Sequence, residues 1–188
     1  MVRTFVALLI PPDWAAHLGA LSDRLSAGTR GLSWVKAENL HITLRFLGDL
    51  DEAAVDRARA AVSQSLALAT APQARLGSLS AFPNLTRPRV LWVGLSEGAE
   101  AVSSLAAAAD AGLREAGFGP SDRPFRAHIT LARVREGARG LETLREAANP
   151  DAPPPAHLDR VAVMKSDLHP SGSRYTALQE VRLRPPDR

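Results

Sequence analysis

Apolar residues follow two different spacings along this chain, and the spacing changes from segment to segment. Segments in which apolar and polar residues alternate, or in which apolar residues run together between Gly, Pro and Asp, predict β-strands. Segments in which apolar residues recur every three or four positions predict amphipathic helices. The strands are expected at residues 1–10, 32–35, 40–47, 74–81, 89–95, 126–134, 158–165 and 174–183. The helices are expected at residues 13–27, 51–66, 97–116 and 141–148.

Residues at the ends of these segments support the division. Pro12 suits the first turn of the first helix, because proline lacks an N–H that this turn does not need. Asp51 is predicted to cap the second helix, and Gly117 to follow the end of the third. The proline-rich segment 149–155 is typical of an extended connector.

The tetrapeptide His-Ile-Thr-Leu occurs twice, at residues 41–44 and 128–131. Only five histidines are present, and two of them are the first residues of these tetrapeptides. The copies lie 87 positions apart (128 minus 41), about half the chain, and each predicted strand has a helix before it and another after it. This arrangement predicts an internal duplication of a βαβ-type unit, with one repeat in each half.

Length and composition limit the kind of protein. A chain of 188 residues with 45% apolar residues is expected to form one domain, over residues 1–188, with a substantial core. The absence of cysteine excludes disulfides, cysteine nucleophiles and thiolate metal ligands. No apolar run approaches the roughly 20 residues of a membrane-spanning helix, and residues 1–10 are interpreted as a buried strand rather than a signal peptide. We therefore expect a cytoplasmic protein without a membrane partner, and nothing demands more than a monomer.

The positive charge of the chain bears on the kind of partner that it could bind. The formal charge of +3 and the isoelectric point near 10.1 come from arginine far more than from lysine. Arginine suits bidentate contact with phosphate, so the balance permits a nucleic-acid partner without establishing one.

Each repeat places an imidazole beside a hydroxyl. Side chains alternate along a strand, so His41 and Thr43 share one face, and His128 and Thr130 do the same. Imidazole titrates near neutral pH, and a general acid and a general base each typically contribute about 10²–10⁴-fold in rate. The threonine hydroxyls could hold two phosphate oxygens from opposite sides. The pattern therefore predicts phosphate chemistry without a metal.

Strand alternation also assigns two arginines. Arg45 continues the face of His41 and Thr43, so it is expected to contact phosphate or ribose, although a solvated strand charge is an equal alternative. Strict alternation puts Arg133 on the strand face opposite to that of His128. Arg133 could therefore reach the same site as His128 only if the strand twists or ends there.

Two other interpretations of the repeats compete with this one. A histidine metal site would need a third ligand at close spacing, and no histidine lies within four positions of another, nor does either repeat strand carry Asp or Glu. The repeats could instead be packing strands, in which case alanine substitutions of the histidines would alter stability but not activity.

With these motifs the chain resembles the two-histidine phosphoesterase superfamily, whose signature is a duplicated His-x-Thr/Ser-x motif. Within it, the chain resembles the bacterial and archaeal RNA 2′,3′-cyclic phosphodiesterases, also called 2′-5′ RNA ligases. The resemblance covers nearly the whole length. Its segments are 3–7 with Pro11, 40–48, 128–134 and 173–176, and one departure is Ala127, where the family pattern has proline.

The resemblance implies a fold and a reaction. The fold would be α+β and bilobal, a pseudo-two-fold duplication in which two antiparallel sheets form a V-shaped central cleft with helices on the outer faces. The substrate would be RNA ending in a 2′,3′-cyclic phosphate, hydrolysed to a 2′-phosphomonoester with no metal and no nucleotide cofactor. The reverse reaction would join such an end to a 5′-hydroxyl.

The resemblance also assigns roles to single residues. His41 would be the proton donor and His128 the proton acceptor. Thr43 and Thr130 would hold the phosphate, and Arg133 matches an arginine of the family. Phe46 and Tyr175 would contact a base or support the core, with the core preferred for Phe46.

Other functions fit the same residues. One alternative is a two-histidine phosphodiesterase acting on a small cyclic nucleotide or a 2′,5′-linked oligonucleotide, which only substrate profiling would separate. Another is a protein that binds RNA ends without turnover, which the presence of two proton-transfer groups argues against.

Overall fold

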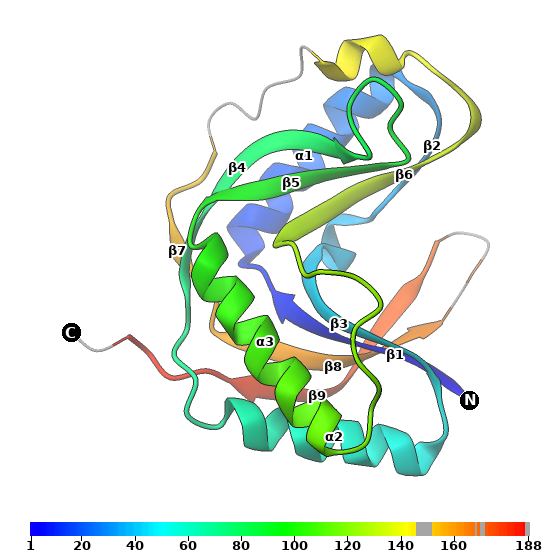
Figure 1. Cartoon of the computed structure of the whole chain (residues 1–188). Coiled ribbons are helices and arrows are strands. Elements are labelled where there is room, and N and C mark those ends of the chain that lie inside the picture. The colour runs from blue at the N-terminus through cyan, green and yellow to red at the C-terminus, as the bar shows by residue number, and fades with distance from the viewer. Residues whose placement is uncertain (146–151, 168, 170–171, 187–188) are drawn as a thin grey trace.

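The main helices and strands follow one another in the order that the apolar pattern predicts (Figure 1). The computed structural model describes residues 1–145, 152–167, 169 and 172–186. Its helices are α1 (Pro12–Gly28), α2 (Glu52–Leu66) and α3 (Ala99–Glu115), with short 3₁₀ helices η1 (Ala37–Asn39) and η2 (Leu141–Arg145). Its strands are β1 (Val2–Leu9), β2 (Arg30–Trp34), β3 (His41–Leu50), β4 (Gln73–Phe82), β5 (Val90–Glu97), β6 (His128–Arg139), β7 (Ala156–His157), β8 (Arg160–Asp167) and β9 (Arg174–Arg182).

Most predicted elements are confirmed. The 3₁₀ helix η1 was not predicted, β3 continues to Leu50 beyond the predicted end at residue 47, and three further elements differ. The Asp51 carboxylate accepts a hydrogen bond of 2.7 Å from the Ala54 N–H and so caps α2 as expected. Strand β6 continues to Arg139, beyond the predicted end at residue 134, because β2 pairs along this extension. The two-residue strand β7 was not predicted. The described part of the expected helix 141–148 is a 3₁₀ helix, and residues 146–151 lie outside the described residues.

The strands form one curled sheet in the order β7-β4-β5-β6-β3-β1-β8-β9, with β2 also paired to β6. All ladders between named strands are antiparallel, within the residues described. Strands β3 and β6 meet at a single pair, Ile42 with Ile129, and then diverge into two arms (Figure 1). The α+β fold is therefore confirmed, and in place of two separate antiparallel sheets there is one curled sheet whose two halves join where the two repeats meet.

The single pair between β3 and β6 also marks the symmetry of the molecule. Ile42 and Ile129 occupy the same position of the two repeats, since 129 minus 42 is again 87. A residue paired with its own equivalent in an antiparallel ladder lies on a local two-fold axis. Both residues are fully buried, so this axis passes through the core, with one repeat on either side.

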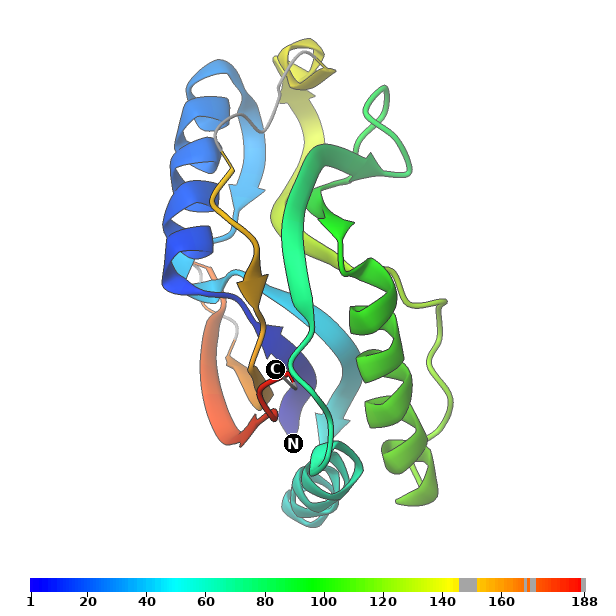
Figure 2. The ribbon, with the colours of Figure 1, turned by 90° about the vertical axis from the view of Figure 1, so that its left-hand side faces the viewer.

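The helices lie on the outside of the curled sheet (Figures 1 and 2). Buried residues from α1, α2 and α3 share one apolar cluster with Ile42 and Ile129. A smaller cluster of Ala81, Leu91, Ala132 and Leu144 fills the arm that carries β6. No helix among the described residues is long and apolar enough to cross a membrane.

Candidate active site

Both histidines of the repeats are anchored in the same way. His41 Nδ1 lies 2.7 Å from the carbonyl oxygen of Asn39, and His128 Nδ1 lies 2.7 Å from that of Arg126. A carbonyl only accepts, so Nδ1 carries the proton in both rings. In the neutral form of each ring, the lone pair is therefore on Nε2. Each ring can take a proton at Nε2, and each can return it from there.

The two repeats stand face to face. Extending the register of Ile42 with Ile129 by one residue on each side sets His41 opposite Thr130 and Thr43 opposite His128. His41 and His128 are then diagonal neighbours, and side chains at diagonal positions lie about 7–8 Å apart. The imidazoles are close enough for the charge of His128 to lower the pKa of His41. A single tetrahedral group between the strands could contact both imidazoles and both hydroxyls.

Partial burial holds both rings toward their neutral forms. Burial lowers the pKa of His41 below the ordinary 6.5, the Asn39 carbonyl acts in the opposite direction, and the charge of His128 adds to the lowering. Burial also lowers the pKa of His128 below 6.5, the Arg126 carbonyl opposes it, and the guanidinium groups of Arg126 and Arg133 add to the lowering. His128 is thus the ring with two fixed cations beside it, which suits a base.

The threonine hydroxyls of the two repeats differ in their contacts. The Thr43 hydroxyl lies 2.9 Å from His41 Nε2, so it donates to the neutral ring. The Thr130 hydroxyl has no hydrogen-bond partner among the described residues and is only half-buried. Both hydroxyls share the half-buried face of their histidines, hereafter the histidine face, as the sequence predicts.

Aromatic rings pack against each histidine of the repeats. The Phe5 ring stacks on His41 with centroids 5.0 Å apart, and the Tyr175 ring meets His41 edge-on at 5.5 Å. Around His128, Phe82 and Trp92 make edge-on contacts at 5.1 and 5.8 Å. These contacts restrict rotation of the imidazoles, and the stacked Phe5 ring also favours a positive charge on His41. Tyr175 therefore lies beside His41 and Phe5.

A β-bulge follows the threonine of each repeat. In the ladder of β1 with β3, Ala7 pairs with Thr43 but Val6 pairs with Arg45, so Leu44 is skipped. In the ladder of β5 with β6, Leu131 is skipped in the same way. A bulge inserts one residue and exchanges the faces of everything beyond it.

The bulges overturn the strand-parity assignment of two arginines. Arg45 turns away from the histidine face and is 6% exposed, so the expectation that it contacts phosphate or ribose is wrong. Arg133 returns to the histidine face, is exposed, and lowers the pKa of His128 by its charge. Phe46 occupies the equivalent position of the first repeat and is 50% exposed, so the preference for a core role is also wrong. The Arg3 guanidinium lies over the Phe46 ring, 4.8 Å from its centroid.

Arg45 instead forms contacts that hold parts of the fold together. One of its nitrogens lies 2.9 Å from an Asp110 carboxylate oxygen on α3, and another donates to the carbonyl of Gly119. Gly119 belongs to the segment that leads from α3 to β6. Arg45 therefore ties the first repeat to the segment that positions the second.

Sequence reasoning missed Phe5, Trp92, Asn39 and Arg126. The signal that could have found them is the repeat offset, because Phe5 and Trp92 are 87 positions apart, and so are Asn39 and Arg126. Within the described part of the chain, no group of three or more His, Cys, Asp or Glu side chains is arranged to hold a metal ion.

Comparisons with known proteins match most of the chain. A sequence model described as LigT like Phosphoesterase matches twice, over residues 8–92 and 93–175, so that each half contains one repeat. A protein of Methanothermobacter thermautotrophicus named RNA 2′,3′-cyclic phosphodiesterase is 30% identical over 186 residues, which are 97% of this chain and 99% of that one. A protein of the same name from Aeropyrum pernix is 33% identical over 172 residues, 88% of this chain and 94% of its own.

Two solved structures share the fold. The crystal structure of TT0787 of Thermus thermophilus has a TM-score of 0.77 at 30% identity, covering 97% of this chain and 98% of that one. The apo form of E. coli LigT has a TM-score of 0.74 at 22% identity, with the same coverage. The curled sheet and outer helices are thus a shared architecture.

Proposed function

This chain belongs to the LigT-like phosphoesterase family, and from that premise we propose that it is an RNA 2′,3′-cyclic phosphodiesterase. It hydrolyses the terminal cyclic phosphate to a 2′-phosphomonoester. The observation that carries the proposal is the pair of imidazoles set about a local two-fold axis, each with Nδ1 bound to a carbonyl and Nε2 left for proton transfer.

His128 is the general base. Burial and the charges of Arg126 and Arg133 lower its pKa, so the ring is neutral and ready to accept a proton at Nε2. Water gives its proton to Nε2 as its oxygen forms a bond to phosphorus. Arg133 and the hydroxyls of Thr43 and Thr130 stabilise the negative charge that develops on the non-bridging oxygens.

His41 is the general acid. It donates the proton on Nε2 to the 3′-oxygen as the bond between phosphorus and that oxygen breaks, leaving a 3′-hydroxyl and a 2′-phosphate. The bound phosphate brings a negative charge that favours the protonated ring, and the Asn39 carbonyl and the Phe5 face favour it further. Substrate also releases the Thr43 hydroxyl from Nε2, so that it can donate to the phosphate. Run backward, the same two groups would join a cyclic phosphate to a 5′-hydroxyl.

The direct test is incubation of the purified protein, in EDTA, with a short oligoribonucleotide ending in 2′,3′-cyclic phosphate. Phosphorus NMR is expected to show conversion of the cyclic phosphate to a 2′-phosphomonoester, because neither proton transfer involves a metal. A 3′-phosphate product would contradict the assignment of the leaving oxygen. No conversion by well-folded protein would point to another phosphodiester or to a binding role.

The pH dependence follows from the two pKa shifts. His128 must be neutral, so kcat/KM falls as pH drops through its lowered pKa. His41 must be protonated, so kcat/KM falls as pH rises through its own, also lowered, pKa. We expect a bell-shaped profile with its maximum below pH 6.5.

Initial rates at substrate concentrations well below KM, measured across the acid and neutral range, check this profile. The Arg126→Gln variant removes one of the charges that lower the pKa of His128, so its acid limb should move to higher pH. A profile that is flat through pH 6.5 would rule out imidazoles as the proton-transfer groups.

A further inference from the structure

The two arms of the sheet carry different side chains at equivalent positions. Strand β6 has Arg133 and Arg135, whereas the positions 87 residues earlier on β3 are Phe46 and Gly48. Both arginines and Phe46 are exposed. At these positions the pair of histidines therefore has two strand arginines on one side, and on the other side an aromatic ring with the Arg3 guanidinium over it, so the two sides of the site differ.

Arg135 lies on the histidine face of β6, beyond Arg133. Ala132 and Val134 pack against the small apolar cluster behind this arm, so alternation turns residues 133 and 135 to the opposite face. Arg133 pairs across the sheet with Ser33 of β2, and Arg135 Nε donates to the Ser33 hydroxyl at 2.7 Å. That bond fixes the guanidinium at Nε, and its two terminal nitrogens remain available to a ligand.

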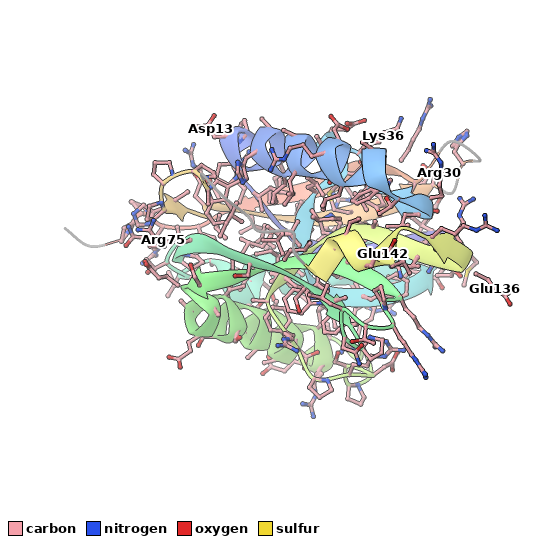
Figure 3. All side chains as sticks on the ribbon, turned by 90° about the horizontal axis from the view of Figure 1, so that it is seen from above. Asp13, Arg30, Lys36, Arg75, Glu136 and Glu142 are labelled. Atoms are coloured by element: carbon pink, nitrogen blue, oxygen red, sulfur yellow. The ribbon has the colours of Figure 1, made fainter. Side chains whose placement is uncertain are left out.

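Within the described residues, no carboxylate forms an ion pair with Arg133 or Arg135, although Glu136 also lies on β6. Arg75 of β4, by contrast, is bound to Glu97. Farther along the arm, Arg30 and Arg139 are direct partners in the ladder of β2 with β6, and like charges opposite each other destabilise a sheet. Figure 3 shows Arg30 at one end of the molecule and Arg75 toward the other. An extended polyanion on this arm would relieve the repulsion.

We propose that Arg135 binds the internucleotide phosphate on the 5′ side of the terminal nucleotide, which makes oligoribonucleotide ends better substrates than mononucleoside 2′,3′-cyclic phosphates. The inference rests on the proposed function and names its substrate class. Two residues of a strand span about 6.8 Å, a spacing comparable with one step of an extended nucleotide chain. With Arg133 at the cyclic phosphate, Arg135 therefore lies where the next phosphate falls, and its terminal nitrogens can bind that phosphate in a bidentate manner.

The test compares two substrates that differ by one phosphate. One is adenosine 2′,3′-cyclic phosphate, and the other is the adenylyl-(3′-5′)-adenosine dinucleotide with the same cyclic end. We expect the wild type to show a higher kcat/KM for the dinucleotide. The Arg135→Gln variant should lower the ratio of the two kcat/KM values by about tenfold, the effect of one charge-assisted hydrogen bond. A dinucleotide with an uncharged methylphosphonate linkage should lose the advantage in wild type and show no further loss in the variant.

Arg75→Gln is the matched control, because it removes the same charge at the other end of the molecule (Figure 3). It should leave the ratio unchanged. A ratio equally unchanged in Arg135→Gln overturns the inference while the proposed function stands.

If the wild type hydrolyses neither substrate, the proposed function fails, and binding decides the inference. Fluorescence anisotropy of a 5′-labelled oligoribonucleotide then measures affinity against salt concentration. Loss of one phosphate contact in Arg135→Gln should reduce the magnitude of the log–log salt slope by about 0.7, the value for single strands. An identical slope in wild type and variant overturns the inference.

Discussion

Replacing either His41 or His128 by alanine is expected to lower kcat about 10²–10⁴-fold, the typical contribution of one general acid or base. The attacking water and the leaving 3′-oxygen lie on opposite sides of phosphorus, so one ring, with only Nε2 for proton transfer, cannot serve both of them. We expect the double variant to lose little more than either single variant, because groups that act as a unit are not additive. Steady-state rates on an oligoribonucleotide with a cyclic phosphate end, with product identified by phosphorus NMR, measure the loss.

His157→Ala is the control for these variants, because His157 is exposed on β7 and pairs with Gln73 of β4, away from the repeats. It should retain wild-type activity. Thermal unfolding of all variants separates catalysis from folding. If His41→Ala and His128→Ala lost stability but kept their rates, the repeats would be packing strands and the proposed mechanism would be wrong.

The Asp110→Ala variant is expected to destabilise the protein by about 3 kcal/mol, the low end for breaking a buried ion pair. The cause is the Arg45 guanidinium, whose side chain is 6% exposed and would be left without its carboxylate, whereas that of Asp110 is 25% exposed. The loss would come from an orphaned buried charge rather than from the pair itself. Replacing both partners, in Arg45→Met with Asp110→Ala, should therefore recover most of the lost stability.

Urea unfolding gives the free energies for this cycle. The control is Glu97→Ala, which breaks the exposed pair with Arg75 and should change the free energy of unfolding by no more than about 1 kcal/mol. If Asp110→Ala lowered the free energy of unfolding by as little as Glu97→Ala does, Arg45 would be solvated. Its contacts between the two repeats would then contribute nothing to stability.

The elements of the fold were predictable where local chemistry decides them. The Asp51 cap requires only its own side chain and the N–H groups of the next turn, and the apolar stripe containing Trp14 and Leu18 requires only helical spacing. The extension of β6 to Arg139 was not predictable, because β2 supplies its hydrogen bonds from about 100 positions earlier in the chain.

In the candidate site, too, some features follow from local sequence and others follow only from the tertiary structure. The sequence by itself determined the two repeats, their 87-residue offset and the shared face of each histidine and threonine, since period-two alternation holds over a few residues of any strand. Only the tertiary structure decided which arginine accompanies them. Bulges at Leu44 and Leu131 arise from pairing with β1 and β5, and they bury Arg45 while presenting Arg133.

The meeting of the two histidines belongs to the tertiary structure as well. Residues 87 positions apart become neighbours through the pair of Ile42 with Ile129, a contact set by the packing of the whole sheet. The lowered pKa values arise there too, from burial and from charges brought by other segments. Local sequence encodes which groups can transfer protons, and long-range packing encodes where those groups meet and what charge they hold.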